Sequence, residues 1–419
     1  MKVLVVGNGG REHALAWKLL QSQHVEQVIC VPGNGGTAIM PRCQNLSLSV
    51  DDFEGIKQCA LTNNISLVVV GPELPLAKGI TDYLQHHQIK VFGPTKQGAQ
   101  IESSKYWAKS LMQSAGVPTA TFAVFMEVEA AKAYIKTQKA PIVVKADGLA
   151  AGKGVTVAAN VEEAQAAVES LFGNGFSTIV IEEFLRGQEV SVLALTDGLT
   201  IRALLPAADH KRIGEGDAGE NTGGMGAYAP APIVTTELMA RIETEILQPT
   251  LEALRQRGID YRGVLYAGLM INTVGDPIVL EFNCRFGDPE TQVILPLLET
   301  PLEHLLLACS EQQLEQLPAI TWKPGAAACV VAASKGYPGA YEKGKQISGI
   351  EQVEALGASV FQAGTQFKQQ QLLTDGGRVL GVTATGESLQ KAIAEAYRAI
   401  DCIKFEGIYY RTDIGHRLI

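Results

Sequence analysis

Glu281 and Asn283 form the pair whose types and spacing most directly suggest chemistry. They lie at the end of the apolar run Ile278–Phe282, two positions apart, so on a β-strand both side chains point to the same face. Adjacent oxygen donors suit Mg²⁺ or Mn²⁺, because Mg²⁺ takes few protein ligands and is otherwise bound by phosphate and water. An ordinary polar strand end would have the same composition, so this pair alone leaves both interpretations open.

The residues that follow this pair favour the metal site. Arg285 supplies a cation, Gly287 permits close approach of the backbone, and Asp288 supplies a carboxylate. Next to a metal, these groups can hold the carboxylate and the amine of a substrate against the terminal phosphate of a nucleotide. Arg285, Asp288 and Asp209 are therefore the predicted catalytic residues.

Two lysines are candidate phosphate ligands. Lys145 continues the apolar strand Ile142–Val144, and a buried ammonium needs a partner, for which phosphate is suitable. Lys105 can bind phosphate in the same way, or can be a surface lysine whose ammonium reaches water.

The glycine-rich loop after Lys145 can place backbone N–H groups over phosphates. It includes Gly152, Lys153 and Gly154. It is not a Walker loop, since Lys153 is followed by a glycine and a strand and not by a Ser or Thr that opens a helix. We expect a mobile hairpin lid, although any flexible turn has a similar composition.

An acidic segment downstream has the form of a hinge between two lobes. Its backbone can pair with the edge of adenine, and a later carboxylate can accept hydrogen bonds from ribose. The predicted nucleotide contacts here are Glu182, Glu183, Phe184, Leu185 and Glu189. A solvated acidic turn would have the same sequence.

The segment Asp209–Arg212 is predicted to be part of an active-site loop that reaches Gly226. Asp209 stands beside two cations, and Arg212 and Asn221 are candidate phosphate contacts. A charged surface loop is the alternative.

The turn Gly7–Gly10 precedes a predicted helix and invites a dinucleotide-binding interpretation. The fingerprint requires a third glycine where this chain has Glu12, and an acidic residue at the end of the next strand, which the chain lacks. A helix N-terminus can bind one phosphate, so a sugar phosphate at Gly9 and Gly10 fits better than NAD. A tight turn without a ligand is the alternative, and His13 is expected to pack against neighbouring elements.

The elements that must position these residues differ along the chain. The first hundred residues contain four apolar runs, each followed by a glycine loop, which predicts an open parallel α/β sheet. From Ser103 to about Leu307 the pattern of helix and strand signals changes to α+β. This part includes a polar loop from Asp209 to Gly226 and one amphipathic helix over Thr236–Arg257. From about Pro318 the sequence predicts a small mixed β domain.

Composition limits the class of function. The net charge of −9 argues against non-specific nucleic-acid binding, which needs a basic surface. No apolar run approaches the ~20 residues that span a bilayer. The seven cysteines include no C-x-x-C pair, so we expect free, mostly buried thiols in a cytoplasmic protein.

With these motifs in hand, the chain resembles the glycinamide ribonucleotide synthetases (phosphoribosylamine–glycine ligases) of the ATP-grasp superfamily. The resemblance runs over essentially the whole chain, and the Arg285–Glu290 motif is highly specific for this family. It implies a domain on the phosphoribosylamine side over residues 1–102, an ATP-grasp domain over 103–317 with a lid at about 121–190, and a C-terminal domain over 318–419. The resemblance rests on seven motifs that occur in this order along the chain: Gly7–His13, Gly71–Glu73, Phe92–Pro94, Lys145–Gly154, Asp209–Arg212, Asn221–Tyr228 and Glu281–Glu290.

The resemblance also implies the reaction and its partners. ATP phosphorylates the carboxylate of glycine, and the amine of 5-phosphoribosylamine then displaces the phosphate, in purine biosynthesis. We expect a monomer. The contacts implied for the two small substrates are Gly9, Gly10, Glu73, Asp209, Arg285, Gly287 and Asp288.

Three other functions remain open at this stage. The first is an ATP-grasp ligase or carboxylase with a different acceptor. The second is an NAD-dependent oxidoreductase built on the N-terminal sheet, and the third is a non-catalytic nucleotide-binding module. The strand Leu269–Ile271 offers no further carboxylate, so a third protein ligand for the metal is not expected from it.

Overall fold

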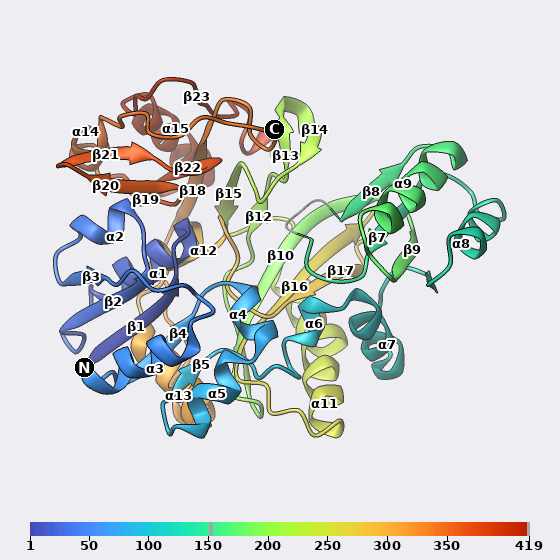
Figure 1. Cartoon of the computed structure of the whole chain (residues 1–419), viewed down its shortest axis with the longest axis horizontal. Coiled ribbons are helices and arrows are strands. Elements are labelled where there is room, and N and C mark those ends of the chain that lie inside the picture. The colour runs from blue at the N-terminus through green and yellow to red at the C-terminus, as the bar shows by residue number, and fades with distance from the viewer. Residues whose placement is uncertain (151–153, 417–419) are drawn as a thin grey trace.

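The computed structural model describes residues 1–150 and 154–416 of the 419-residue chain. Figure 1 shows the blue N-terminal and red C-terminal segments on one side of a green and yellow central sheet, and a smaller teal segment projecting on the other side. The predicted site residues Gly152 and Lys153 lie outside the described residues. Among the described helices, none has the length and apolar character needed to cross a membrane.

The N-terminal segment is a parallel five-stranded sheet with the order β3-β2-β1-β4-β5, as its apolar runs predict. The short strand β3 was not predicted, because Cys43–Asn45 contains no apolar run. The strands are β1 (Lys2–Gly7), β2 (Gln27–Pro32), β3 (Cys43–Asn45), β4 (Leu67–Val70) and β5 (Val91–Phe92). The helices are α1 (Gly10–Leu19), α2 (Gly35–Ile39), α3 (Phe53–Thr62), α4 (Glu73–Lys78) and α5 (Ile80–His86).

The projecting segment is an antiparallel sheet with the order β6-β9-β7-β8, covered by two helices. Its buried side chains, such as Ile142, Val168 and Ile181, form a hydrophobic cluster of their own. The predicted hairpin around the glycine-rich loop is confirmed, since β7 and β8 pair antiparallel. The elements are β6 (Phe122–Phe125), α8 (Val128–Ile135), β7 (Ile142–Ala146), β8 (Val155–Ala158), α9 (Val161–Gly173) and β9 (Ile179–Glu183).

The central sheet has the order β11-β10-β16-β17, in which β16 and β17 pair as an antiparallel hairpin. Its strands are β10 (Gly187–Thr196), β11 (Ile201–Ala203), β16 (Gly263–Asn272) and β17 (Pro277–Asn283). The associated helices are α6 (Gln100–Ser103), α7 (Lys105–Ala115), α10 (Thr236–Ile242), α11 (Gln248–Gln256), α12 (Thr291–Ile294) and α13 (Leu302–Glu311).

The predicted long helix over Thr236–Arg257 is confirmed as one unbroken helical stretch that ends at Gln256. Within it a π-helical segment, Glu243–Leu247, separates α10 from α11. Pro249 lies just after this segment, and because proline has no N–H to donate to the carbonyl one turn back, the regular α-helical hydrogen bonding is interrupted there.

The predicted polar loop from Asp209 to Gly226 is wrong in one respect, because the segment contains short strands. This segment begins at β12, contains the two-stranded hairpin β13–β14 and ends at β15. The strands are two to four residues long, so none has enough alternating residues to be recognised in the sequence. The bounds are β12 (Ala208–Asp209), β13 (Arg212–Gly214), β14 (Ala218–Asn221) and β15 (Gly226–Ala229).

The C-terminal sheet includes strands from the central segment. Its order is β12-β15-β18-β22-β19, with β23 paired to β18. Its own elements are β18 (Ala326–Ser334), α14 (Ile350–Ala355), β19 (Ser359–Gln362), β22 (Arg378–Gly386), α15 (Leu389–Ile400) and β23 (Ile408–Tyr409). A separate hairpin consists of β20 (Thr365–Lys368) and β21 (Gln371–Thr374).

His13 joins the N-terminal and C-terminal segments, as the packing interpretation predicts. Its ring is buried against Phe361, and its Nδ1 accepts a 2.7 Å hydrogen bond from the N–H of Gln362 on β19. Burial lowers the pKa of His13 from 6.5 to about 4, so the residue is neutral at pH 7.

Candidate active site

A cavity of about 1310 Å³ lies where the three sheets and the projecting segment meet. Seventeen of the predicted site residues in the described chain line it, whereas Gly10 and Gly287 do not. The residues that line it are Gly9, Glu73, Lys105, Lys145, Gly154, Glu182, Glu183, Phe184, Leu185, Glu189, Asp209, Arg212, Asn221, Glu281, Asn283, Arg285 and Asp288.

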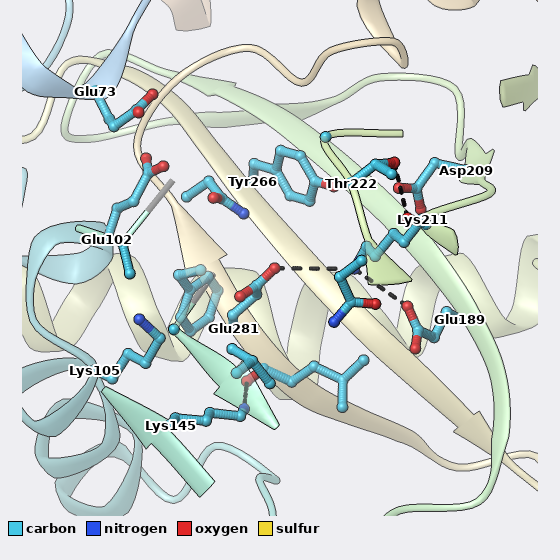
Figure 2. Close-up of a pocket in the computed structure, with 18 of the residues that line it drawn as sticks. Glu73, Glu102, Lys105, Lys145, Glu189, Asp209, Lys211, Thr222, Tyr266 and Glu281 are labelled. Atoms are coloured by element: carbon cyan, nitrogen blue, oxygen red, sulfur yellow. Dashed lines mark hydrogen bonds and ion pairs between the residues drawn. The ribbon is translucent and has the colours of Figure 1, made fainter. Parts of the chain in front are cut away.

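Glu281 and Asn283 project into the cavity from the end of β17 (Figure 2). Three lysines surround Glu281: Lys105 and Lys145 on one side and Lys211 on the other, with Lys211 Nζ 3.9 Å from Glu281 Oε1. Burial alone would raise the pKa of Glu281, but these lysines and Arg285 hold it below its usual value. The carboxylate is therefore ionised and available to a cation.

Lys145 and Lys109 share one buried carboxylate. Lys145 Nζ lies 2.9 Å and Lys109 Nζ 3.0 Å from Glu182 Oε2, and Lys145 also donates to the Leu280 carbonyl at 3.2 Å. Burial lowers the pKa of Lys109 to about 8, with Glu182 opposing the shift. Two ammonium groups on one carboxylate leave a surplus positive charge on the cavity wall.

Lys105 begins α7 and reaches the glycine-rich loop. Its Nζ donates to the Gly148 carbonyl at 3.1 Å. Burial lowers the pKa of Lys105, and the nearby Glu281 opposes that shift. Lys105 is thus a cavity residue and not a surface lysine.

Glu189 and Lys211 form an ion pair on the opposite wall, with Lys211 Nζ 3.2 Å from Glu189 Oε2. Burial alone would lower the pKa of Lys211, but Glu189, Asp209 and Glu281 raise it well above its usual value. Lys211 therefore connects the predicted ribose contact Glu189 with the predicted metal ligand Glu281.

The predicted hinge connects β9 to β10. Glu183 accepts a 2.8 Å hydrogen bond from the N–H of Thr121, and the Arg186 guanidinium lies 5.7 Å from the centre of the Phe184 ring. The neighbouring cavity wall is apolar and consists of Val143, Val157, Met270 and Leu280.

Arg285 is held between two carboxylates. Its Nη2 lies 3.0 Å from Glu102 Oε1 and its Nε 3.4 Å from Glu73 Oε2. Glu102 also accepts a 2.8 Å hydrogen bond from the N–H of Cys284. Burial raises the pKa of Glu102, which Arg285 opposes, whereas Arg285 and Arg11 hold the pKa of Glu73 low against the effect of burial.

The N-terminus of α1 already binds carboxylates of the protein. The N–H of Gly9 donates to Glu12 Oε2 at 2.6 Å, and the N–H of Arg11 donates to Asp288 Oδ2 at 3.1 Å. Burial would raise the pKa of Asp288, but Arg378 and Arg11 keep it lowered. These two backbone groups are thus engaged by carboxylates in this arrangement, and the predicted substrate contacts at Gly9 and Gly10 stay predictions.

Gly10 and Gly287 have packing roles. A Cβ atom on Gly10 would lie 2.6 Å from the side-chain nitrogen of Gln292, and one on Gly287 would collide with Glu290. Glu290 in turn accepts hydrogen bonds from Tyr266 at 2.5 Å and Ser191 at 3.0 Å. This buried network fixes the loop that carries Asp288.

Several cavity residues were not predicted from the sequence: Arg11, Glu102, Lys109, Lys211, Tyr266, Tyr337 and Arg378. Lys109 follows Lys105 by one helical turn, so the i, i+4 spacing was a usable signal. Lys211 lies in the predicted active-site segment Asp209–Arg212, in which the predicted phosphate contact is its neighbour Arg212. Glu102 and Arg378 reach the site only through the tertiary fold.

Family models match three consecutive parts of the chain. The "Phosphoribosylglycinamide synthetase, N domain" model matches residues 1–102, the "ATP-grasp (A) domain" model matches 103–291 and the "C domain" model matches 327–417.

Curated relatives and solved structures agree with these matches. A phosphoribosylamine–glycine ligase from Nostoc sp. is 70% identical over 100% of both chains, and one from Synechocystis sp. is 59% identical over 100% of both. The crystal structure of a phosphoribosylamine–glycine ligase from Thermotoga maritima has a TM-score of 0.84 at 35% identity, covering 99% of this chain and 100% of that one. A biotin carboxylase from Campylobacter jejuni shares the fold, with a TM-score of 0.73 at 16% identity over 98% and 92% of the chains.

These findings confirm the predicted fold class, in which a parallel N-terminal sheet is followed along the chain by an ATP-grasp region. They also confirm the predicted class of enzyme, a ligase. The chain belongs to the phosphoribosylglycinamide synthetase family of ATP-grasp ligases.

Proposed function

We propose that this protein joins glycine to 5-phosphoribosylamine in purine biosynthesis, with conversion of ATP to ADP and phosphate. The observation that carries the proposal is that one cavity combines phosphate-binding lysines, a pair of oxygen donors and a carboxylate-held arginine in a chain that matches this ligase family throughout. NAD chemistry has no comparable support.

ATP is proposed to bind between the projecting sheet and the central sheet. The apolar wall described above accepts adenine, and the backbone of Glu183–Leu185 pairs with its edge. Glu189 accepts hydrogen bonds from ribose, and Lys105 and Lys145 bind the phosphates, with Gly154, Arg212 and Asn221 as further contacts. The roles of Gly152 and Lys153 stay predictions, since both lie outside the described residues.

Glu281 and Asn283 would hold Mg²⁺ or Mn²⁺. Both oxygen donors line the cavity from one strand end, and the lysines around Glu281 keep its carboxylate ionised, so the donor set fits a hard divalent cation. When bound, the metal neutralises charge on the transferred phosphate.

The substrates are proposed to react at the Arg285 end of the cavity. Arg285, oriented by Glu73 and Glu102, holds the carboxylate of glycine so that one carboxylate oxygen attacks the γ-phosphorus of ATP and ADP leaves. The amine of phosphoribosylamine then attacks the acyl carbon of glycyl phosphate, releasing phosphate and one proton. Asp209 and Asp288 are proposed to orient the reacting amine groups, and Gly9 lies next to this end.

The test is phosphate release by the purified protein with ATP and Mg²⁺. We expect rapid release only when glycine and freshly formed phosphoribosylamine are both present, together with glycinamide ribonucleotide detected by mass spectrometry. Equal release without phosphoribosylamine, or with bicarbonate in place of glycine, would show that the acceptor is different.

We also propose that the protein acts as a cytoplasmic monomer with domain limits at 1–102, 103–317 and 318–419 and a lid at about 121–190. Sedimentation equilibrium tests the oligomeric state, because a monomer gives the 44.7 kDa mass of the chain. Limited proteolysis near residues 102 and 317 tests the domain limits.

A further inference from the structure

The β13–β14 hairpin lines the cavity but has no core of its own. Residues 212–221, all within the described chain, include no buried side chain. Two-stranded hairpins are at best marginally stable in water, so the position of this one must be set by other contacts. Figure 1 shows it beside the red end of the chain.

The tail segment, residues 409–416, supplies those contacts. Arg411 is fully buried, and its Nη1 donates to the Arg212 carbonyl and to Asp217 Oδ1, both at 3.0 Å. Its Nε and Nη2 both donate to Asp413 at 2.7 Å, and Asp413 in turn accepts a 2.7 Å hydrogen bond from the N–H of Gly216. One guanidinium thus bridges the start and the tip of the hairpin.

Neighbouring tail residues continue this interface. Tyr409 donates to the Ile213 carbonyl at 2.7 Å, and Thr412 donates to Glu215 at 2.5 Å. The N–H of Gly415 donates to the Nε2 of His210 at 3.1 Å.

The tail is itself fixed to the C-terminal sheet. Tyr409 pairs with Ala333 of β18, and the Tyr397 hydroxyl on α15 donates to the Arg411 carbonyl at 2.9 Å and accepts from the N–H of Ile414 at 2.8 Å. Ile414 is buried and would contact a side chain placed on Gly226. The hairpin is therefore attached to a rigid part of the fold.

The base of the hairpin determines where Lys211 points. The N–H and the hydroxyl of Thr222 donate to the Lys211 carbonyl at 2.7 and 2.8 Å, and the Lys211 ammonium faces Glu189 and Glu281. We infer that Arg411 is a positioning residue: the tail segment holds the hairpin so that Lys211, Arg212 and Asn221 meet the nucleotide. This inference rests on the proposed function for its kinetic consequence but not for its structural one.

The structural consequence is tested by hydrogen exchange on the ligand-free full-length protein. In Arg411→Ala, peptides covering residues 211–222 are expected to exchange roughly tenfold faster, whereas the central strand β10 is unchanged. The matched control is Arg398→Ala, which removes an exposed arginine on α15 that pairs with Glu395. Unchanged exchange at 211–222 in Arg411→Ala overturns the inference.

The kinetic consequence separates positioning from simple loss of folded protein. A smaller folded fraction lowers kcat alone, whereas a displaced hairpin also raises the KM for ATP, which we expect to increase roughly tenfold in Arg411→Ala. Arg411→Lys keeps the charge but cannot make the forked contacts, so it should restore less than half of the loss. A KM for ATP equal to that of the wild type overturns the inference.

Tyr409→Phe provides a second, milder variant should Arg411→Ala not fold. It removes only the hydroxyl that donates to Ile213 and leaves a half-exposed ring. Exchange at 211–222 should still increase, and no increase would overturn the inference. If the wild-type protein releases phosphate without needing both substrates, the proposed function fails, but the exchange result still decides the role of the tail.

Discussion

Replacing Lys145 with methionine separates a contact needed for catalysis from one needed for folding. Lys145 and Lys109 both bind Glu182 Oε2, at 2.9 and 3.0 Å, and all three side chains are buried. Only Lys145 also reaches the Leu280 carbonyl, next to Glu281, and Lys145 helps to lower the pKa of Glu281. Lys109 donates instead to the Thr119 hydroxyl at 2.7 Å.

The expected loss of stability is small. Removing a hydrogen bond to a charged group costs about 1.5–3 kcal/mol, and breaking a buried ion pair outright costs about 3–5 kcal/mol. In Lys145→Met the carboxylate of Glu182 keeps Lys109 as its partner. The cost should therefore lie near the lower value, about 1.5 kcal/mol.

The expected loss of turnover is large. A preorganised group that stabilises charge in the transition state contributes about 2.7–4 kcal/mol, which corresponds to a factor of about 10²–10³ in kcat. Lys109→Met is the matched control, because it removes the same charge from the same carboxylate but leaves Lys145 beside the phosphate site. We expect it to retain at least about a tenth of the wild-type kcat.

The assay is steady-state phosphate release with both substrates saturating, alongside urea unfolding of each variant. A Lys145→Met enzyme within about threefold of the wild type would refute the placement of the phosphates. Equal losses of kcat in the two variants would refute the distinction between the lysines.

Three further predictions follow from single residues. In the wild type only the unfolded chain protonates residue 13 between pH 6.5 and about 4, so the stability that His13 contributes above pH 6.5 falls by about 3 kcal/mol as the pH drops through this interval. His13→Gln should remove this part of the pH dependence, which urea unfolding of both proteins above and below the interval would measure. Glu281→Gln should raise the Mg²⁺ concentration for half-maximal turnover roughly tenfold, and EDTA should abolish wild-type turnover. Glu102→Gln leaves Arg285 with Glu73 alone and should raise the KM for glycine roughly tenfold with little change in the KM for ATP, as initial rates would reveal.

The sequence predicts those parts of the fold that depend on short-range patterns. Parallel strands such as β1 and β4 are continuous apolar runs that end in glycine loops, and the β16–β17 hairpin places Glu281 and Asn283 by simple alternation. The cavity wall that carries the proposed metal ligands Glu281 and Asn283 could therefore be predicted without a structure.

The remaining site residues depend on partners far away in the chain. Glu102 accepts a hydrogen bond from Cys284, which lies 182 positions later, and Arg378 meets Asp288 across 90 positions. No local pattern encodes such pairs, because the two partners of each pair lie in elements that only the tertiary fold brings together.

The turn before α1 is the instructive exception. The sequence indicated free N–H groups at Gly9 and Gly10 that could bind a sugar phosphate, but Glu12 accepts the hydrogen bond from the Gly9 N–H. A glutamate three residues after the N-cap is a recognised capping signal. Glu12 occupies the position of the missing third glycine of the dinucleotide fingerprint, so one residue carries both signals.

The charges around Glu281 and Arg285 indicate which substrate groups approach each end of the cavity. Lys105, Lys145 and Lys211 surround Glu281 and favour anions there, which suits the phosphates of ATP. At the other end Glu73 and Glu102 surround Arg285 and raise its pKa against the effect of burial, so two carboxylates face one guanidinium and the immediate surroundings of Arg285 are acidic. An acidic surrounding repels phosphate and attracts amines, so the amine of the acceptor should approach from this side while its own phosphate stays farther away. If reversing the charge at Glu73, as in Glu73→Lys, lowered the KM for phosphoribosylamine, this assignment of the two ends would be wrong.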